Sequence, residues 1–298
     1  MPRRSLPPSL PESFTTAEAL VAGATPDQLR RRSLSRPHHG VRSLRAAVDD
    51  VDRARQALPL LRPDEAFCHR TALALWGLPE VGGTDLRVHV GGTASRQRKR
   101  PALTSHRYVL LRPVVHLGLP VVDPVEAWVQ AAPVLSIEDL VVLGDALAGG
   151  WSPHRMARLV PVRLLEEAVL AAEARPGVRR LRRAVELVRE RVDSPQETRL
   201  RLLVTGGGLP EPEVNVRRWT TDGQFLGRPD LSWPGARVAL EYEGDHHRTD
   251  VRTFRSDILR RERFADEGWH LMRVTADDLT PAGSRALLAR LHRRLLPE

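Results

Sequence analysis

Residues 194–298 carry the pattern that most restricts how this chain can fold: a helix, three strand-like runs joined by turns, a second helix and a fourth strand. The third run alternates Val238, Leu240 and Tyr242 with residues that face the opposite side, which is the period of a strand with one buried face. Because a helix connects the third strand to the fourth, these two strands are expected to be parallel. The expected elements are a helix from 195 to the glycines at 206–208, strands over 213–219, 225–233, 237–243 and 269–275, a helix over about 251–267, and a closing helix around 287–295.

The turn between the second and third strands decides whether Asp230 and Glu241 share a face. A two-residue turn at Gly235-Ala236 sets them directly opposite, and one at Pro234-Gly235 sets them diagonally on the same face. A three-residue loop would separate them, because a slip of one residue moves every side chain across the sheet. Two carboxylates on one face are unfavourable unless a proton or a cation neutralises them, which is the physical case for a metal ion. The alternative is an amphipathic hairpin with two ordinary exposed acids.

This segment resembles a PD-(D/E)XK nuclease domain related to very short patch repair endonucleases. The likeness spans nearly all of residues 194–298 and implies a restriction-endonuclease-like α-β-β-β-α-β core that cleaves DNA. One departure concerns the family's catalytic lysine, two residues after the strand carboxylate, which is Glu243 here. Acidic residues also occur at that place in the related family, so activity stays open. The matching residues are Glu197, 227–231, 238–248, Asp257, Arg260 and 268–270.

A hard divalent cation such as Mg²⁺ or Mn²⁺ would suit this acidic site, because such ions prefer oxygen ligands. The expected metal ligands are Asp230, Glu241 and the backbone carbonyl of Tyr242. Such an ion would polarise a phosphate oxygen and lower the pKa of a bound water. The expected catalytic residues are Glu197, Asp230, Glu241, Glu243 and His247.

Several of these residues also have a plainer interpretation. Glu197 can serve as a helix-capping glutamate at Ser194, and Glu243 can be a charge at a strand end. The resemblance makes His247 a general base or phosphate contact and lets Arg260 hold the scissile phosphate. Asp257 and Arg261, four residues apart, can instead form an intrahelical ion pair. The adjacent His246 and His247 lack the further His or Cys that a zinc site needs.

The N-terminal half begins with two capped helices. Thr15 and Thr25 each stand three residues before an acid or amide, and Pro26 follows the second, which is typical of helix starts. The pair predicts a helix-turn-helix followed by a hairpin-like wing. Further elements are expected as a helix over 64–78, strands over 86–90 and 106–111, a basic loop at 96–100, and helices over 137–148 and 162–191 with a break at 176–177.

The opening helices, Gly40-Val41 and the run from Phe67 to Pro79 resemble the N-terminal region of abortive-infection type antitoxins. That resemblance covers roughly the first half of the chain and implies a winged helix-turn-helix repressor. It gives the alternative function: a DNA-binding transcriptional regulator whose nuclease-like domain has lost catalysis, which the missing lysine supports. The single cysteine, Cys68, excludes intramolecular disulfides and a cysteine-based zinc cage.

The formal net charge of +9 points to a polyanionic partner. Lys99 is the only lysine, so a GC-rich genome is an equal explanation for the arginine content. We expect duplex DNA as the partner and no membrane partner. The charge alone does not exclude RNA. The sequence leaves open whether the protein is a monomer or a homodimer. The expected nucleic-acid-binding residues are Arg30, Arg31, Arg32, Arg98, Lys99, Arg100, Arg228, Arg248 and Arg260.

The length of 298 residues predicts more than one compact unit in a mixed α/β (α+β) chain. No apolar run is long enough to span a bilayer, and the first residues lack the apolar core of a signal peptide, so a cytoplasmic location is expected. The expected division is a winged helix-turn-helix region over 1–60, a mixed α+β region over 61–150, a helical linker over 151–193 and the endonuclease-like domain over 194–298.

Overall fold

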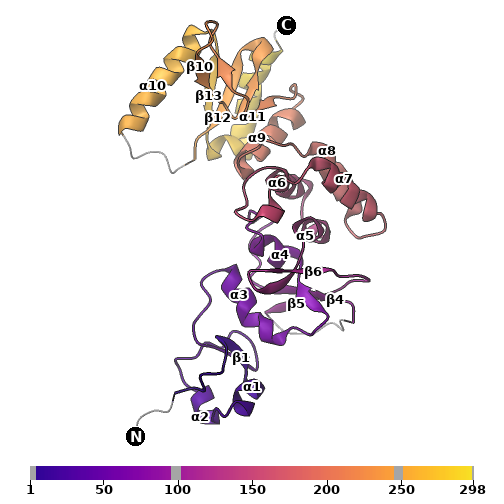
Figure 1. Ribbon diagram of the computed structural model, residues 1–298. Coiled ribbons are helices and arrows are strands. Elements are labelled where there is room, and N and C mark those ends of the chain that lie inside the picture. Colours follow the sequence, from indigo (N-terminus) through magenta and orange to yellow (C-terminus); the bar gives the residue numbers. More distant parts are fainter. Residues whose placement is uncertain (1–4, 95–101, 245–250, 297–298) are drawn as a thin grey trace. The chain divides into compact units, whose positions relative to one another are not determined.

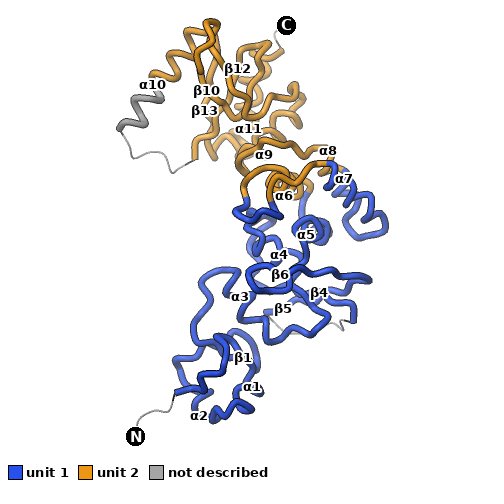
Figure 2. The backbone as a smooth tube through the Cα atoms, viewed as in Figure 1, with its two compact units in different colours: residues 1–136, 152–157, 163–182 blue, residues 137–151, 158–162, 183–298 orange. Residues whose placement is uncertain are grey.

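The computed structural model describes residues 5–94, 102–244 and 251–296. For residues 251–258 it describes the backbone alone. Its helices and strands form an α+β arrangement, which confirms the expected class (Figure 1). In this described part of the chain, no helix combines the length and the hydropathy that a bilayer-spanning segment requires. The chain divides into two compact units, unit 1 with residues 1–136, 152–157 and 163–182 and unit 2 with residues 137–151, 158–162 and 183–298 (Figure 2).

The N-terminal helices begin at the threonine caps that the sequence predicts. Each starts with a complete capping box, in which the threonine and the residue three positions on bond to each other's backbone. The hairpin expected after them is reduced to a single bridge between Ser35 and Ser43, and the strand at 41–43 pairs mainly with the strand that precedes the helices. The elements are β1 (Ser13–Thr15), α1 (Thr16–Val21), α2 (Pro26–Leu29) and β2 (Val41–Ser43).

A five-stranded mixed sheet, in the order β5-β4-β3-β7-β6, forms the centre of unit 1. The single helix predicted over 64–78 is wrong in its first part, because 65–67 is the central strand of this sheet. Its pairing with β4 and β7 outweighs the helical period of the sequence. The strands are β3 (Glu65–Phe67), β4 (Val88–Gly92), β5 (Leu103–Arg107), β6 (Pro113–His116) and β7 (Leu119–Val122).

The helix predicted over 162–191 is interrupted at Gly177, as expected. Gly177 has a φ of +85°, and a Cβ there would lie 2.7 Å from the backbone of Ala132, so only glycine fits. The division between the units falls within the helix that follows. The helices in this part of the chain are α3 (Asp50–Ala57), α4 (His69–Leu75), α5 (Pro124–Ala131), α7 (Val162–Ala171) and α8 (Val178–Leu187).

Unit 2 contains a four-stranded sheet in the order β13-β12-β11-β8. β12 and β13 are parallel and the other pairs are antiparallel, which confirms the helical crossover predicted between them. Helix α6 also belongs to this unit, so the compact unit begins well before the boundary expected at residue 194. The elements are α6 (Ile137–Ala148), α9 (Pro195–Gly206), β8 (Glu213–Val214), β11 (Leu231–Trp233), β12 (Val238–Tyr242), α10 (Val251–Asp266), β13 (His270–Val274) and α11 (Pro281–Leu295).

The first two strands predicted in this unit are each split in two. Their inner parts, β8 and β11, join the main sheet, whereas β9 (Arg218–Trp219) and β10 (Phe225–Gly227) form a separate antiparallel pair. The turn between β11 and β12 is also longer than predicted. A short 3₁₀ turn at Pro234–Ala236 is followed by Arg237 at a φ of +50°.

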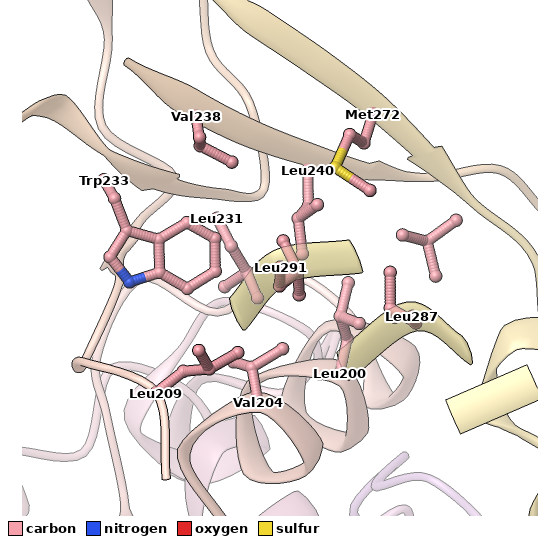
Figure 3. Packing of buried hydrophobic residues seen from close by; sticks show 11 residues of the cluster. Leu200, Val204, Leu209, Leu231, Trp233, Val238, Leu240, Met272, Leu287 and Leu291 are labelled. Atoms are coloured by element: carbon pink, nitrogen blue, oxygen red, sulfur yellow. The ribbon is translucent and has the colours of Figure 1, made fainter. Parts of the chain in front are cut away.

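Apolar side chains of α9, α11 and one face of the sheet form the core of unit 2 (Figure 3). Leu200 and Val204 come from α9, Leu287 and Leu291 from α11, and alternate sheet positions supply the rest. The strand residues in this core are Leu231, Trp233, Val238, Leu240, Met272 and Val274. Residues at the intervening positions therefore lie on the opposite face of the sheet.

Candidate functional site

Asp230 directly precedes β11 and lies near Glu241 of β12, whose charge acts on it. Leu231 pairs with Leu240, and the two acids are the next residues beyond this pair. Because the leucines face the core, both carboxylates lie on the other face of the sheet. The turn is longer than predicted, yet the register is the one that a turn centred on Gly235-Ala236 would give.

Asp230 is held by backbone groups and has a perturbed carboxyl group. Its Oδ2 accepts a hydrogen bond from the Tyr242 N–H at 2.7 Å, and its carbonyl accepts one from the Asn215 N–H at 2.9 Å. Burial and then the charge of Glu197 raise the pKa of Asp230 to about 7, although the Tyr242 N–H opposes this shift. Asp230 can therefore gain or lose a proton near neutral pH.

Glu197 lies in the first turn of α9 and is buried. Its Oε1 accepts from the Ser194 hydroxyl at 2.9 Å, and its Oε2 accepts from the Asp193 N–H at 3.0 Å. The same Oε2 also accepts from Asn215 Nδ2 at 2.6 Å. Glu197 thus makes the helix-end contacts that its plainer interpretation predicts. Through Asn215 it is also linked to the backbone of Asp230, so the two interpretations are compatible.

Arg260 of α10 forms an ion pair with Oε1 of Glu241. Its guanidinium passes Gly227, where a Cβ would lie 2.9 Å from Arg260 Nε and 2.8 Å from the ring of Phe264. The glycine therefore leaves the space that this arginine occupies. The acidic pair therefore does not rely on a metal ion or a proton alone for neutralisation, because an arginine on the neighbouring helix already supplies a cation.

Glu243, which stands where the resembling family has lysine, forms an ion pair with Arg273 of β13. In the parallel register Arg273 lies beside Glu241, on the same face of the sheet. A cation from the next strand is therefore present close to the place of the missing lysine. The face carries three acids, Asp230, Glu241 and Glu243, with the two arginines that pair with the glutamates.

The donor set on this face suits a hard divalent cation. Asp230 and Glu241 offer carboxylate oxygens. The N–H of Tyr242 points towards Asp230, and in an extended strand the carbonyl of the same residue points to the same side. Binding a metal ion at both carboxylates would require Asp230 to be ionised and Arg260 to share or release Glu241. Whether these residues bind metal stays a prediction.

Some residues predicted from the sequence lie outside the described part of the chain or away from the acidic face. His246, His247, Arg248, Arg98, Lys99 and Arg100 lie outside the described residues, and the side chain of Asp257 is likewise not described. Arg228 is exposed and pairs with Asp193, although its charge also acts on Asp230. Arg30, at the end of α2 beside Arg31 and Arg32, is largely exposed and pairs with Asp27 at 3.1 Å.

Sequence reasoning missed Asn215 and Arg273 as parts of the site. Arg273 could have been found from its strand, where Met272 and Val274 face the core and the residue between them must face the acids. Asn215 has a φ of +52°, a conformation that asparagine tolerates better than most residues, but its link to Glu197 spans distant parts of the chain. Local patterns do not reveal such a contact.

Comparison with known proteins places the chain near mycobacterial proteins of undescribed activity. It is 27% identical over 228 residues to the uncharacterized proteins MT2308 and Rv2248 of Mycobacterium tuberculosis, from strains CDC 1551 and H37Rv, covering 76% of this chain and 80% of theirs. The crystal structure of the RV2827C protein from Mycobacterium tuberculosis matches with a TM-score of 0.39 at 17% identity, over 59% of this chain and 72% of that one. No protein-family model matches the sequence.

Proposed function

We propose that unit 2 is a metal-dependent endonuclease that hydrolyses phosphodiester bonds in DNA, with Mg²⁺ or Mn²⁺ held by Asp230 and Glu241. The observation that carries this proposal is the proximity of these two carboxylates: the Tyr242 N–H of β12 donates to Asp230, and the charge of Glu241 contributes to the raised pKa of Asp230. A carboxyl group with a strongly perturbed pKa, as in Asp230, occurs more often at functional sites than elsewhere. The sequence resemblance to PD-(D/E)XK nucleases, with helix, strands, crossover helix and parallel strand in the same order, supports the same assignment.

Asp230, Glu197 and Arg260 each have a proposed role. Asp230 would hold the ion in its ionised form, and the Tyr242 N–H keeps its carboxylate in place. Bound there, the metal ion would polarise the phosphate and lower the pKa of a water nucleophile. Glu197 holds negative charge next to Asp230, and its hydrogen bonds fix its position. Arg260 leaves Glu241 to contact the phosphate, for which its planar, multidentate guanidinium is suited.

The N-terminal region would bind the DNA that unit 2 cleaves. The exposed arginines at the end of α2 suit phosphate contacts, which depend on charge more than on sequence. A DNA substrate would place this activity in the cytoplasm.

The proposal is tested by metal titration of nuclease activity on supercoiled plasmid and on duplex, mismatched, branched and single-stranded DNA. Wild-type protein is expected to nick at least one of these forms with Mg²⁺ or Mn²⁺ and none with chelator. Glu241→Gln removes a charged ligand and is expected to lower the rate by more than about 100-fold, as loss of groups that hold or orient a metal does. Glu262→Gln, on the exposed surface of α10, is the matched control and should retain the rate. Equal rates in all three proteins would remove Glu241 from the site.

The competing function is a DNA-binding regulator with an inactive nuclease-like domain. The ion pairs Glu241–Arg260 and Glu243–Arg273 favour it, since they neutralise acids that a nuclease would keep for metal. It predicts a mobility shift on specific DNA that needs no divalent ion, together with no cleavage of any DNA or RNA form. Cleavage that requires Glu241 would exclude this function.

A further inference from the structure

Three histidines gather in unit 1, far in sequence from the acidic site. His69 is the first residue of α4, His89 lies on β4 and His106 on the parallel neighbour β5. Each ring has a nitrogen atom that lies within 4.8 Å of a nitrogen atom in each of the other two rings. The ring centroids are 4.8 to 5.2 Å apart. The sheet and the start of the helix thus bring three imidazoles to one point.

The nitrogen positions fit a single transition-metal ion. Nδ1 of His89 and Nε2 of His106 are 2.9 Å apart. Two nitrogens bound to one tetrahedral Zn²⁺ at ordinary bond lengths are about 3.3 Å apart, so a small rotation of the rings would admit the ion. His69 is 4% exposed, and its Nδ1 has no hydrogen-bond partner among the described residues. Buried polar nitrogens usually have a hydrogen-bond partner, so this nitrogen can offer its lone pair to a metal ion.

Asp85 supplies the outer contact that metal-bound histidines usually have. Its Oδ2 lies 3.2 Å from Nε2 of His89, which leaves Nδ1 of the same ring directed at His106. A carboxylate that accepts the outer N–H of a histidine fixes the tautomer and makes the inner nitrogen a better ligand. Arg87 holds the same carboxylate through hydrogen bonds of 2.8 and 2.9 Å.

The backbone also fixes the rings. The His69 N–H donates to Oε1 of Gln130 at 3.1 Å, and the His89 N–H donates to the Thr71 hydroxyl at 2.8 Å. Burial lowers the pKa of His69 to about 3 and that of His106 to about 4, and it lowers the pKa of His89 as well. The rings are therefore neutral near pH 7, the form in which imidazole binds metals.

We propose that His69, His89 and His106 bind one transition-metal ion of the Zn²⁺ class, with Asp85 orienting His89. Imidazole suits Zn²⁺, Co²⁺, Ni²⁺ and Cu²⁺ and is a poor ligand for Mg²⁺, so this site differs in chemistry from the acidic face of unit 2. Three protein ligands leave the fourth position of a tetrahedral ion to water. The bound ion joins α4, β4 and β5 of unit 1.

The test is a titration of chelator-treated full-length protein with Co²⁺ and with Zn²⁺. It uses the Glu241→Gln background, so that the acidic face contributes little. Co²⁺ is expected to bind at one equivalent with the intense visible absorption of a four-coordinate ion, and Zn²⁺ should displace it and raise the melting temperature. Asp85→Asn should weaken Zn²⁺ binding by about 10- to 100-fold. His89→Gln and His106→Gln should each abolish the absorption.

The exposed His270→Gln on β13 is the matched control and should leave the titration unchanged. Circular dichroism shows whether each histidine variant is folded, and Asp85→Asn, which keeps all three ligands, provides a test that does not depend on their folding. The proposal is overturned if the wild-type histidines give no four-coordinate Co²⁺ spectrum, or if folded His89→Gln and His106→Gln bind as the parent does. Because cleavage is not measured, this result is independent of the nuclease proposal.

Discussion

Replacing Asp145 by alanine is expected to lower the free energy of unfolding of unit 2 by about 3–5 kcal/mol, the usual effect of removing one partner of a buried ion pair. Asp145 of α6 and Arg201 of α9 are both 0% exposed, and Oδ2 of the acid lies 3.0 Å from Nη2 of the arginine. The guanidinium left behind cannot lose its proton at any ordinary pH. It would therefore stay charged and buried without the carboxylate that balances its charge.

The other contacts of Asp145 add to this effect. Its Oδ1 accepts from the Arg189 N–H at 2.7 Å, and its Oδ2 accepts from the Thr198 hydroxyl at 2.8 Å. Asp145→Ala removes both acceptors along with the charge. Arg201→Met is expected to cost less, because the remaining carboxylate can neutralise itself by binding a proton. The double variant Asp145→Leu/Arg201→Met should recover part of the loss.

A second ion pair between the same two helices serves as the control. Glu138 of α6 and Arg199 of α9 lie 3.2 Å apart with side chains 54% and 32% exposed. Arg199→Ala is expected to cost less than about 1 kcal/mol, as exposed pairs usually do. Denaturant unfolding, followed by circular dichroism and by tryptophan fluorescence, measures all four variants. A loss in Asp145→Ala no larger than that in Arg199→Ala would contradict the prediction.

The buried pair also bears on the candidate site. Arg201 and Thr198 lie on α9 within one turn of Glu197, so their contacts with Asp145 fix the helix end that carries this acid. The expected domain boundary at residue 194 separated Asp145 from these partners. A pattern-based division missed their contact because it spans more than fifty residues of sequence. Composition shifts mark loops and linkers, whereas packing decides which helices share a core.

Local chemistry made much of unit 2 predictable. The cap at Ser194, the alternation along β12 and the crossover helix before β13 each follow from a short stretch of sequence, and the structure has all of them. The register of Asp230 against Glu241 was limited to a few alternatives by the turn residues. The folded structure was needed to decide which register forms, because the loop adopts a conformation that differs from both two-residue turns.

The charge balance of the site was not predictable in the same way. Arg260 and Arg273 come from elements after β12, and their pairing with the glutamates depends on how α10 and β13 pack. The histidine cluster of unit 1 shows the same limit. Its members are spaced 20 and 17 residues apart, which matches no short metal-binding motif, and only the sheet brings them together.

Asp230→Asn is expected to stabilise unit 2 at alkaline pH while abolishing its proposed metal-dependent cleavage. Burial raises the pKa of Asp230 from 3.8 to about 7, so the folded state binds a proton that the unfolded state has lost across this range. Stability therefore falls as pH rises from about 4 to 7, and the full cost of the charged form remains above pH 7. Asparagine keeps the acceptor for the Tyr242 N–H and never carries the charge.

The size of this effect follows from the pKa shift. At about 1.4 kcal/mol per pKa unit, the variant gains up to about 4 kcal/mol over wild type at pH 8 and less than half of that at pH 5. Denaturant unfolding at both pH values without divalent ions measures it. Asp222→Asn is the control with the opposite sign, because hydrogen bonding by the Thr220 hydroxyl lowers the pKa of that exposed acid.

Metal ions should change wild type and Asp230→Asn differently. Mg²⁺ or Mn²⁺ that binds the ionised Asp230 would stabilise the wild-type protein at pH 8 by mass action, and the variant would show little response. The same residue would then be costly to the fold and required for cleavage, which is the usual trade between stability and activity at a catalytic site. A variant that is less stable than wild type at pH 8 would show that the Asp230 carboxylate stabilises the fold. A variant that still cleaves DNA with metal would show that Asp230 is not required for the reaction.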